Sequence, residues 1–237
     1  YDIIVFNRSF NDFSNIAFRG NSYETLEAYA RKVETRVDKK TRVETRTIIS
    51  SPDELAAATL EGFTVTEDML GNYSQTTYGR TAPSRSSEET PDGLYHLHFV
   101  PKKLTREVSA VLHIEGLNNI RSATCRLGGV AESIFLATGK TSANTVTQEF
   151  TPSNPEFSPG SPFNGTLSCE FEIFGLNVID NNNLHLDALL VDGKTEFEGD
   201  CTNVKITEND DGTGSVTLIL EASTEKVPDV KPEGGDR

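Results

Sequence analysis

Apolar and polar residues alternate through the second half of the chain, which predicts short β-strands. In REVSAVLHIEGL, the apolar residues that share one face are Val108, Ala110, Leu112 and Ile114. GTLSCEFEIFG (165–175) and GSVTLILEA (214–222) repeat the pattern. NLHLDALLVDGKTEFEG (183–199) indicates a hairpin that turns at Asp192-Gly193. About seven or eight such strands between residues 98 and 222 are typical of a β-sandwich.

The chain opens on YDIIVFN, in which Ile3 and Val5 lie on one face of a predicted strand and Ile4 and Phe6 on the other. A strand that is apolar on both faces is expected inside a sheet or sandwich. Such a strand is not expected at a free terminus, which raises the question of what lies upstream of Tyr1.

Two further segments of the first part carry local signals. VETRVDKKTRVETR (33–46) alternates on both sides of its centre and predicts a hairpin with a solvated, charged face. In SSPDELAAAT, Ser51 at the N-cap, Pro52 at the first helical position and Glu54 form a capping box, which predicts a short helix near 52–59. NSYETLEAYARK (21–32) fits helical spacing less clearly.

Loop-like composition predicts the domain organisation. TTYGRTAPSRSSEETPDG (76–93) is rich in Ser, Thr, Pro and Gly and marks a boundary. We expect an N-terminal sandwich over 1–97 and a C-terminal sandwich over 98–222. The tail 223–237 is charged and nearly without apolar residues, so we expect it to be disordered.

Composition excludes several classes of protein. The formal net charge is -14 over 237 residues, which argues against binding to a nucleic-acid backbone. No apolar run reaches the roughly 18 residues that span a bilayer. The three cysteines are widely spaced and form no disulfide framework. We expect Cys125 and Cys169 to be buried and reduced, with a bridge through Cys201 as the alternative.

The search for chemistry finds no catalytic or cofactor motif. LATGKTS (136–142) lacks the first glycine of a phosphate loop and reads as a turn after a strand. His96 and His98 could share a strand face, but solvent-exposed histidines are favoured. ENDDGTG (208–214) resembles half of a calcium loop, and a hairpin turn is favoured over a weak calcium site. We predict no catalytic residues, no metal ligands and no cofactor.

Four stretches together resemble the fimbrillin-type surface lipoproteins of Bacteroidetes, and most closely their fimbrial anchor or accessory branch. They are YDIIVFN, SPDEL, the long FVPKKLTREVSAVLHIEGLNNIRSATCRLGGVAESIFLATGK, and GTLSCEFEIFG with LLVDGKTEFEGDCTNV. The resemblance covers roughly residues 1–222. It implies an all-β protein of two transthyretin-like, Greek-key β-sandwich domains, the N-terminal one partial.

The resemblance also implies a function without an enzyme activity. Such proteins are displayed at the outer membrane through a lipid on an upstream Cys and serve in cell adhesion. Partners would be other fimbrial subunits, joined by strand addition, which needs main-chain pairing and alternating apolar side chains. The tail STEKVPDVKPEGGDR is a poor donor strand, whereas YDIIVFN suggests a sandwich that accepts one.

Two alternatives remain open. A module that binds host or bacterial surface glycans would need aromatic side chains on one face, and Tyr73, Tyr78 and Tyr95 around the boundary loop are the candidates. A hydrolase would need convergent acids in a cleft, and no such constellation is evident in the sequence.

Overall fold

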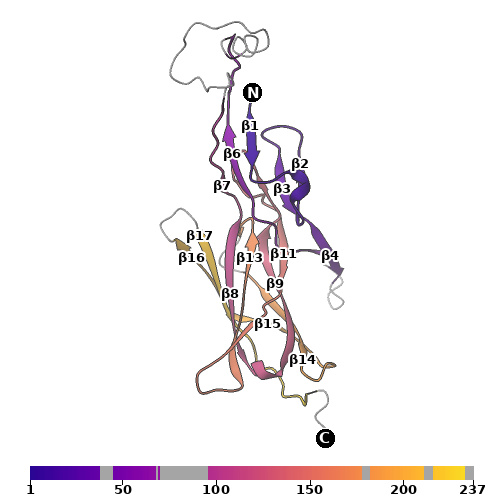
Figure 1. Ribbon diagram of the computed structural model, residues 1–237. Coiled ribbons are helices and arrows are strands. Elements are labelled where there is room, and N and C mark those ends of the chain that lie inside the picture. The colour runs from indigo at the N-terminus through magenta and orange to yellow at the C-terminus, as the bar shows by residue number, and fades with distance from the viewer. Residues whose placement is uncertain (38–44, 68, 70–95, 178–181, 211–215, 233–237) are drawn as a thin grey trace.

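The computed structural model describes residues 1–37, 45–67, 69, 96–177, 182–210 and 216–232, and the chain is all-β (Figure 1). Two large sheets form the body. The first, six-stranded, has the order β15 (Glu196–Asp200), β14 (Leu184–Leu190), β9 (Ile120–Ala131), β11 (Thr145–Phe150), β5 (Thr45–Ile49) and β4 (Lys32–Val37). The second, five-stranded, has the order β12 (Asn154–Phe157), β13 (Asn164–Ile173), β8 (Arg106–Glu115), β17 (Val216–Ser223) and β16 (Thr202–Asp210).

Two small sheets extend the body toward the N-terminal end (Figure 1). One has the order β1 (Ile3–Phe6), β6 (Ala56–Leu60) and β7 (Lys102–Lys103). The other has the order β10 (Ser133–Phe135), β3 (Glu27–Ala30) and β2 (Ile16–Arg19). Short 3-10 turns η1 (Phe10–Asp12) and η2 (Leu117–Asn119) connect strands.

A continuous apolar core lies between the two large sheets. The predicted inward residues of β8 are all buried, as are Leu218 and Leu220 of β17. Across the core, the rings of Phe150 on β11 and Phe171 on β13 stack with centroids 4.3 Å apart. The alternation in the second half of the chain therefore predicted both the strands and their buried faces.

Strands on either side of residue 97 share sheets. β3 pairs with β10, β6 pairs with β7, and β5 pairs in parallel with β11. Ile49 and Leu55 lie in the same core as the buried residues of β8 and β9. The predicted boundary between 97 and 98 therefore does not separate the sheets, and the separability of the two parts stays a prediction.

The predicted helix near 52–59 is wrong. Ser51 does not cap a helix; its hydroxyl instead accepts the Glu172 N–H at 2.9 Å and so ties the segment to β13. Residues 56–60 form β6, which pairs antiparallel with β1 over Ile3↔Leu60 to Phe6↔Ala57. Partner strands and burial of Leu55 thus override a favourable helical start.

Several local predictions are confirmed. β4 and β5 pair antiparallel, as predicted for 33–46, although the turn at 38–44 lies outside the described residues. β14 and β15 pair as the predicted hairpin, and Gly193 at its turn has φ 69°. LATGKTS forms a turn after β10, in which the Gly139 N–H bonds the Phe135 carbonyl at 2.8 Å.

The predicted disorder of the tail is wrong for residues 224–232. Val227 is 0% exposed and its N–H bonds the Glu115 carbonyl at 2.9 Å. Asn119, itself buried, donates from its side chain to Asp229 at 3.0 Å. The tail therefore packs against the end of β8 and η2, because two valines suffice to anchor an otherwise polar segment.

All three cysteines are free thiols, which matches the predicted reduced state. Cys125 is buried as predicted, whereas Cys169 is only half-buried, so that part of the prediction is wrong. Burial raises the pKa of Cys125 strongly, and burial raises the pKa of both Cys169 and Cys201 to about 11.

We expect thiol alkylation at pH 8 to be slow at Cys169 and Cys201 and absent at Cys125 until the protein unfolds. The thiolate is the reactive form, and a raised pKa leaves little of it at that pH. Peptide mass spectrometry after timed labelling measures each site. Labelling of native Cys125 as fast as that of an unfolded control would contradict this expectation.

Candidate functional site

The first candidate feature is the free edge of β1. β1 is a terminal strand, and β6 is its hydrogen-bonded neighbour in the described sheet. The Asn7 N–H donates to the Ala56 carbonyl at 3.1 Å. This bond shows which residues of β1 direct their main-chain groups toward β6. Because antiparallel pairs alternate, residues 3, 5 and 7 bond β6, and the N–H groups of Ile4 and Phe6 point to the free edge.

The two edges of this small sheet differ in side-chain chemistry. β7 at one edge consists of Lys102 and Lys103, the kind of charged residues that keep edge strands from pairing with other chains. β1 at the other edge is Ile-Ile-Val-Phe, and each of its four residues is half-buried. The β1 edge thus carries no such protection within its own strand.

Aromatic side chains support β1 from one side. The Phe6 ring packs on Phe10 at 4.8 Å and on Phe18 of β2 at 5.4 Å between centroids. Phe10 is 52% exposed, so this cluster reaches the surface. The contacts hold β1 in an extended conformation.

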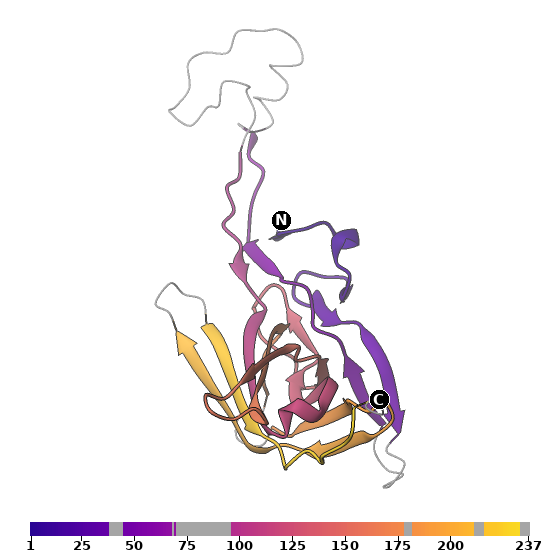
Figure 2. The ribbon, with the colours of Figure 1, turned by 60° about the horizontal axis from the view of Figure 1, so that its bottom comes forward.

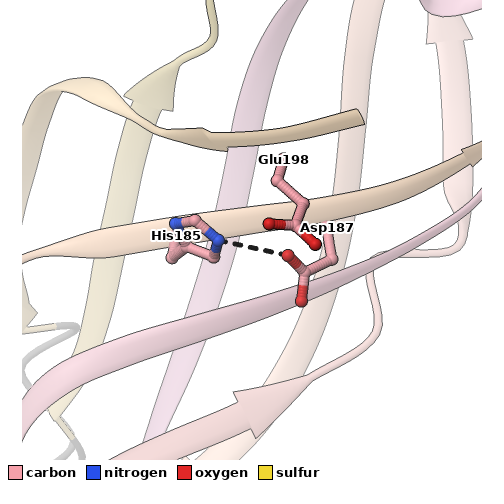
Figure 3. A group of neighbouring side chains, drawn as sticks. All are labelled: His185, Asp187 and Glu198. Atoms are coloured by element: carbon pink, nitrogen blue, oxygen red, sulfur yellow. Dashed lines mark hydrogen bonds and ion pairs between the residues drawn. The ribbon is translucent and has the colours of Figure 1, made fainter. Parts of the chain in front are cut away.

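The second candidate feature is a group of charged side chains on the outer face of the six-stranded sheet, shown in Figure 3. His185 and Asp187 come from β14 and Glu198 from β15. One ligand atom from each of these three residues lies within 4.8 Å of the others. The register brings them together, because Asp187 pairs directly with Glu198, and His185 with Asp200.

His185 lies between two carboxylates. Its Nδ1 is 2.9 Å from Asp200 Oδ1, and its Nε2 is 3.1 Å from Asp187 Oδ1. Arg126 of β9 bonds the other oxygen of Asp187, and its Nε donates to Glu149 of β11 at 3.0 Å. Partial burial lowers the pKa of Arg126, but the bonds and charges of Asp187 and Glu149 outweigh this and raise it.

The residues singled out from the sequence do not form this cluster. Tyr73, Tyr78 and Tyr95 lie outside the described residues, so the glycan-contact prediction stays a prediction. His96 and His98 lie exposed in an irregular segment. β16 and β17 pair as the hairpin predicted around ENDDGTG, and the turn at 211–215 lies outside the described residues.

The charged cluster could have been found from the sequence. The hairpin 183–199 was predicted with its turn at Asp192-Gly193, and a register counted outward from that turn places HLD opposite EGD. Acidic pairs alone carry little information in this sequence, because a chain with 36 acidic residues offers many chance pairs.

The fold thus defines a class: an all-β protein with two packed sheets, a small described sheet in which β1 is an edge strand, and a segment after β17 folded back on its body. In the described part of the chain, no helix has the length and apolarity needed to cross a membrane. The chain belongs to the family described as "Domain of unknown function (DUF5119)", whose profile matches residues 1–151. The matched region runs across residue 97 and includes β1.

One solved structure shares the fold. It is a crystal structure of a "putative adhesin" from Bacteroides ovatus, with a TM-score of 0.51 and 16% sequence identity. The match covers 84% of this chain and 64% of the Bacteroides ovatus chain, so this chain spans less than two thirds of that protein. No curated protein matches the chain.

Proposed function

We propose that the chain is a non-enzymatic structural or adhesive protein of the bacterial cell surface, a fimbrial anchor or accessory subunit. In this proposal its sheets form transthyretin-like sandwiches, and it is displayed at the outer membrane. The fold likeness to the Bacteroides ovatus protein supports an adhesive role, as does the sequence resemblance to fimbrillin-type lipoproteins.

The observation that carries the proposal is the position of β1 at the edge of its described sheet, with an apolar sequence and no charged residue in the strand. A partner subunit would add an extended strand there, bonding the outward main-chain groups of Ile4 and Phe6. The opposite edge of the same sheet, β7, carries two lysines, which disfavour pairing with another chain, whereas β1 is apolar. This difference supports a role for β1 in strand pairing.

The tail supports a receiving role rather than a donating one. Thr224 and Val227 already bond the carbonyls of His113 and Glu115 on β8, at 3.1 and 2.9 Å. A tail that is folded into its own core must detach before it could enter another subunit. In this proposal the subunit receives a strand and does not supply residues 224–232 to another subunit.

We expect a donor-strand peptide to slow hydrogen exchange at the amides of Ile4 and Phe6 at least tenfold. The probes are extended peptides with apolar residues at alternate positions, as strand addition requires, with scrambled peptides as controls. The amides of Ile3 and Val5 already face β6, so their exchange should change much less. Exchange measured by NMR resolves the two sets.

Matched variants test the same site. Ile3→Lys with Val5→Lys adds charge on the face of β1 opposite to Ile4 and Phe6, which pack on the core. We expect peptide binding to fall at least tenfold with little change in folding. Val33→Lys on the edge strand β4, where Val33 is 57% exposed, is the control and should bind normally. Unchanged β1 exchange with every peptide would refute strand addition here.

A further inference from the structure

We propose that His185, Asp187 and Glu198 form a binding site for a divalent transition-metal ion, with Zn²⁺ the best match. The inference concerns the outer face of the β14–β15 hairpin and is independent of the β1 edge. These three residues lie outside the region matched by the family profile. The site would use His185 Nε2, Asp187 Oδ1 and a Glu198 carboxylate oxygen.

The first support for a metal site is the balance of hydrogen-bond donors and acceptors around His185. A neutral imidazole has one N–H and one acceptor nitrogen. When Nδ1–H donates to Asp200 Oδ1 at 2.9 Å, the lone pair of Nε2 faces Asp187 Oδ1 at 3.1 Å. Two acceptors then meet, and either a second proton on the ring or a metal ion between them removes the repulsion. Figure 3 shows Nε2 directed at Asp187, with Glu198 beside them.

The second support for a metal site is the like charge of Asp187 and Glu198. They are direct cross-strand partners in the β14–β15 register, an arrangement that destabilises a sheet. Arg126 bonds the far oxygen of Asp187. Within the described part of the chain Glu198 makes no ion pair, so its charge is available to a bound ion.

Outer groups fix the orientation of the proposed ligands. Asp200 holds Nδ1 of His185, and Arg126 holds the other oxygen of Asp187. Metal-binding histidines commonly donate their second nitrogen to a carboxylate in this way, which orients the ring and raises its basicity. Arg126 is itself fixed by Glu149 on the next strand at 3.0 Å. The arrangement spans β15, β14, β9 and β11.

The donor set selects the class of ion. Imidazole with carboxylates suits Zn²⁺ and similar divalent ions, whereas Ca²⁺ and Mg²⁺ prefer oxygen ligands alone. Three protein ligands leave positions for water or for a group from another molecule. His185 and Asp187 are half-buried and Glu198 is exposed, so an ion reaches the site from solvent.

Titration calorimetry of the full chain with Zn²⁺ tests the proposal. The background carries His96→Gln and His98→Gln, because those exposed histidines could bind zinc on their own. We expect one Zn²⁺ per chain, and binding at least tenfold tighter than that of Ca²⁺. Saturating Zn²⁺ should also raise the melting temperature, because it binds the folded state.

Variants separate a built site from general attraction to an acidic surface. His185→Gln and Glu198→Gln should each weaken Zn²⁺ binding at least tenfold, and Asp200→Asn by a smaller factor through the ring orientation. Glu196→Gln removes the same charge from the same exposed face of β15, and should change binding less than twofold. Circular dichroism and the zinc-free melting temperature of each variant report whether the fold is kept.

Absence of Zn²⁺ binding in the background protein would overturn the proposal. So would an equal loss in Glu196→Gln and Glu198→Gln, because the ion would then respond to charge alone. Retention of binding in a folded His185→Gln variant would likewise exclude the site. The peptide-binding assay at β1 is a separate measurement, so failure of one proposal leaves the other standing.

Discussion

Removal of residues 224–237 is expected to destabilise the protein by about 3–5 kcal/mol, given the apolar burial and hydrogen bonds that it would lose. Val227 is fully buried and Val230 packs partly against the core. The deletion also removes the bonds from the tail to β8, and it leaves the buried amide of Asn119 without Asp229.

Urea unfolding tests this prediction. The truncated chain should unfold at a lower urea midpoint, with a nearly unchanged dependence of the free energy of unfolding on urea concentration. Val227→Asp is the sharpest point variant, because it places a charge at a fully buried position. Gly116→Ala should act similarly, since Gly116 has φ 88° and a Cβ there would lie 2.7 Å from the Val227 carbonyl oxygen. Lys226→Ala, at an exposed position, is the matched control and should be nearly neutral. A truncated chain as stable as the whole would show that the tail does not dock in solution.

The docked tail shows where composition misleads. The segment from 223 carries few apolar residues, and average hydrophobicity predicts disorder. Its position in the fold decides otherwise, because β17 ends beside β8 and directs the chain over η2. A single residue, Val227, then packs against Gly116. No local pattern within the tail contains that information.

Period-two alternation predicted most of the second half of the chain, because each strand there has one face in the core. It predicted the pairing partners less well. β8 lies between β13 and β17, and the parallel pairing of β17 with β8 joins residues that are far apart in the sequence. Such pairings depend on how the sheets pack, which the residues of one strand do not specify.

The capping box at Ser51 shows a second limit. Ser, Pro and Glu occupy favourable positions for a helix start, and the following alanines are good helix formers. The strand forms because β1 and β7 lie on either side of residues 56–60. The charged cluster at His185 was within reach of sequence reasoning, since it needs only the register of a hairpin whose turn was predicted.

Cleavage of the chain within residues 70–95 is expected to leave two fragments that remain associated. Three pairings join them: β3 with β10, β5 with β11, and β6 with β7. Leu55 is fully buried and Ile49 is 2% exposed, both in the core shared with β8 and β9. Burial of each of these two side chains contributes about 1.5–3 kcal/mol, which is a large part of a typical total stability of about 5–15 kcal/mol.

A protease recognition sequence inserted after Ser84 makes the cut specific, and the uncut protein with the same insertion is the control. After cleavage, both fragments should elute together at the position of the whole chain and separate in concentrated urea. Residues 98–237 produced alone should lack a cooperative unfolding transition, because β11 loses β5 and the core loses Ile49 and Leu55. A fragment 98–237 that unfolds cooperatively at the melting temperature of the whole chain would contradict this expectation. It would instead support two independent sandwiches divided at residue 97, with the shared strands contributing little to the stability of the second.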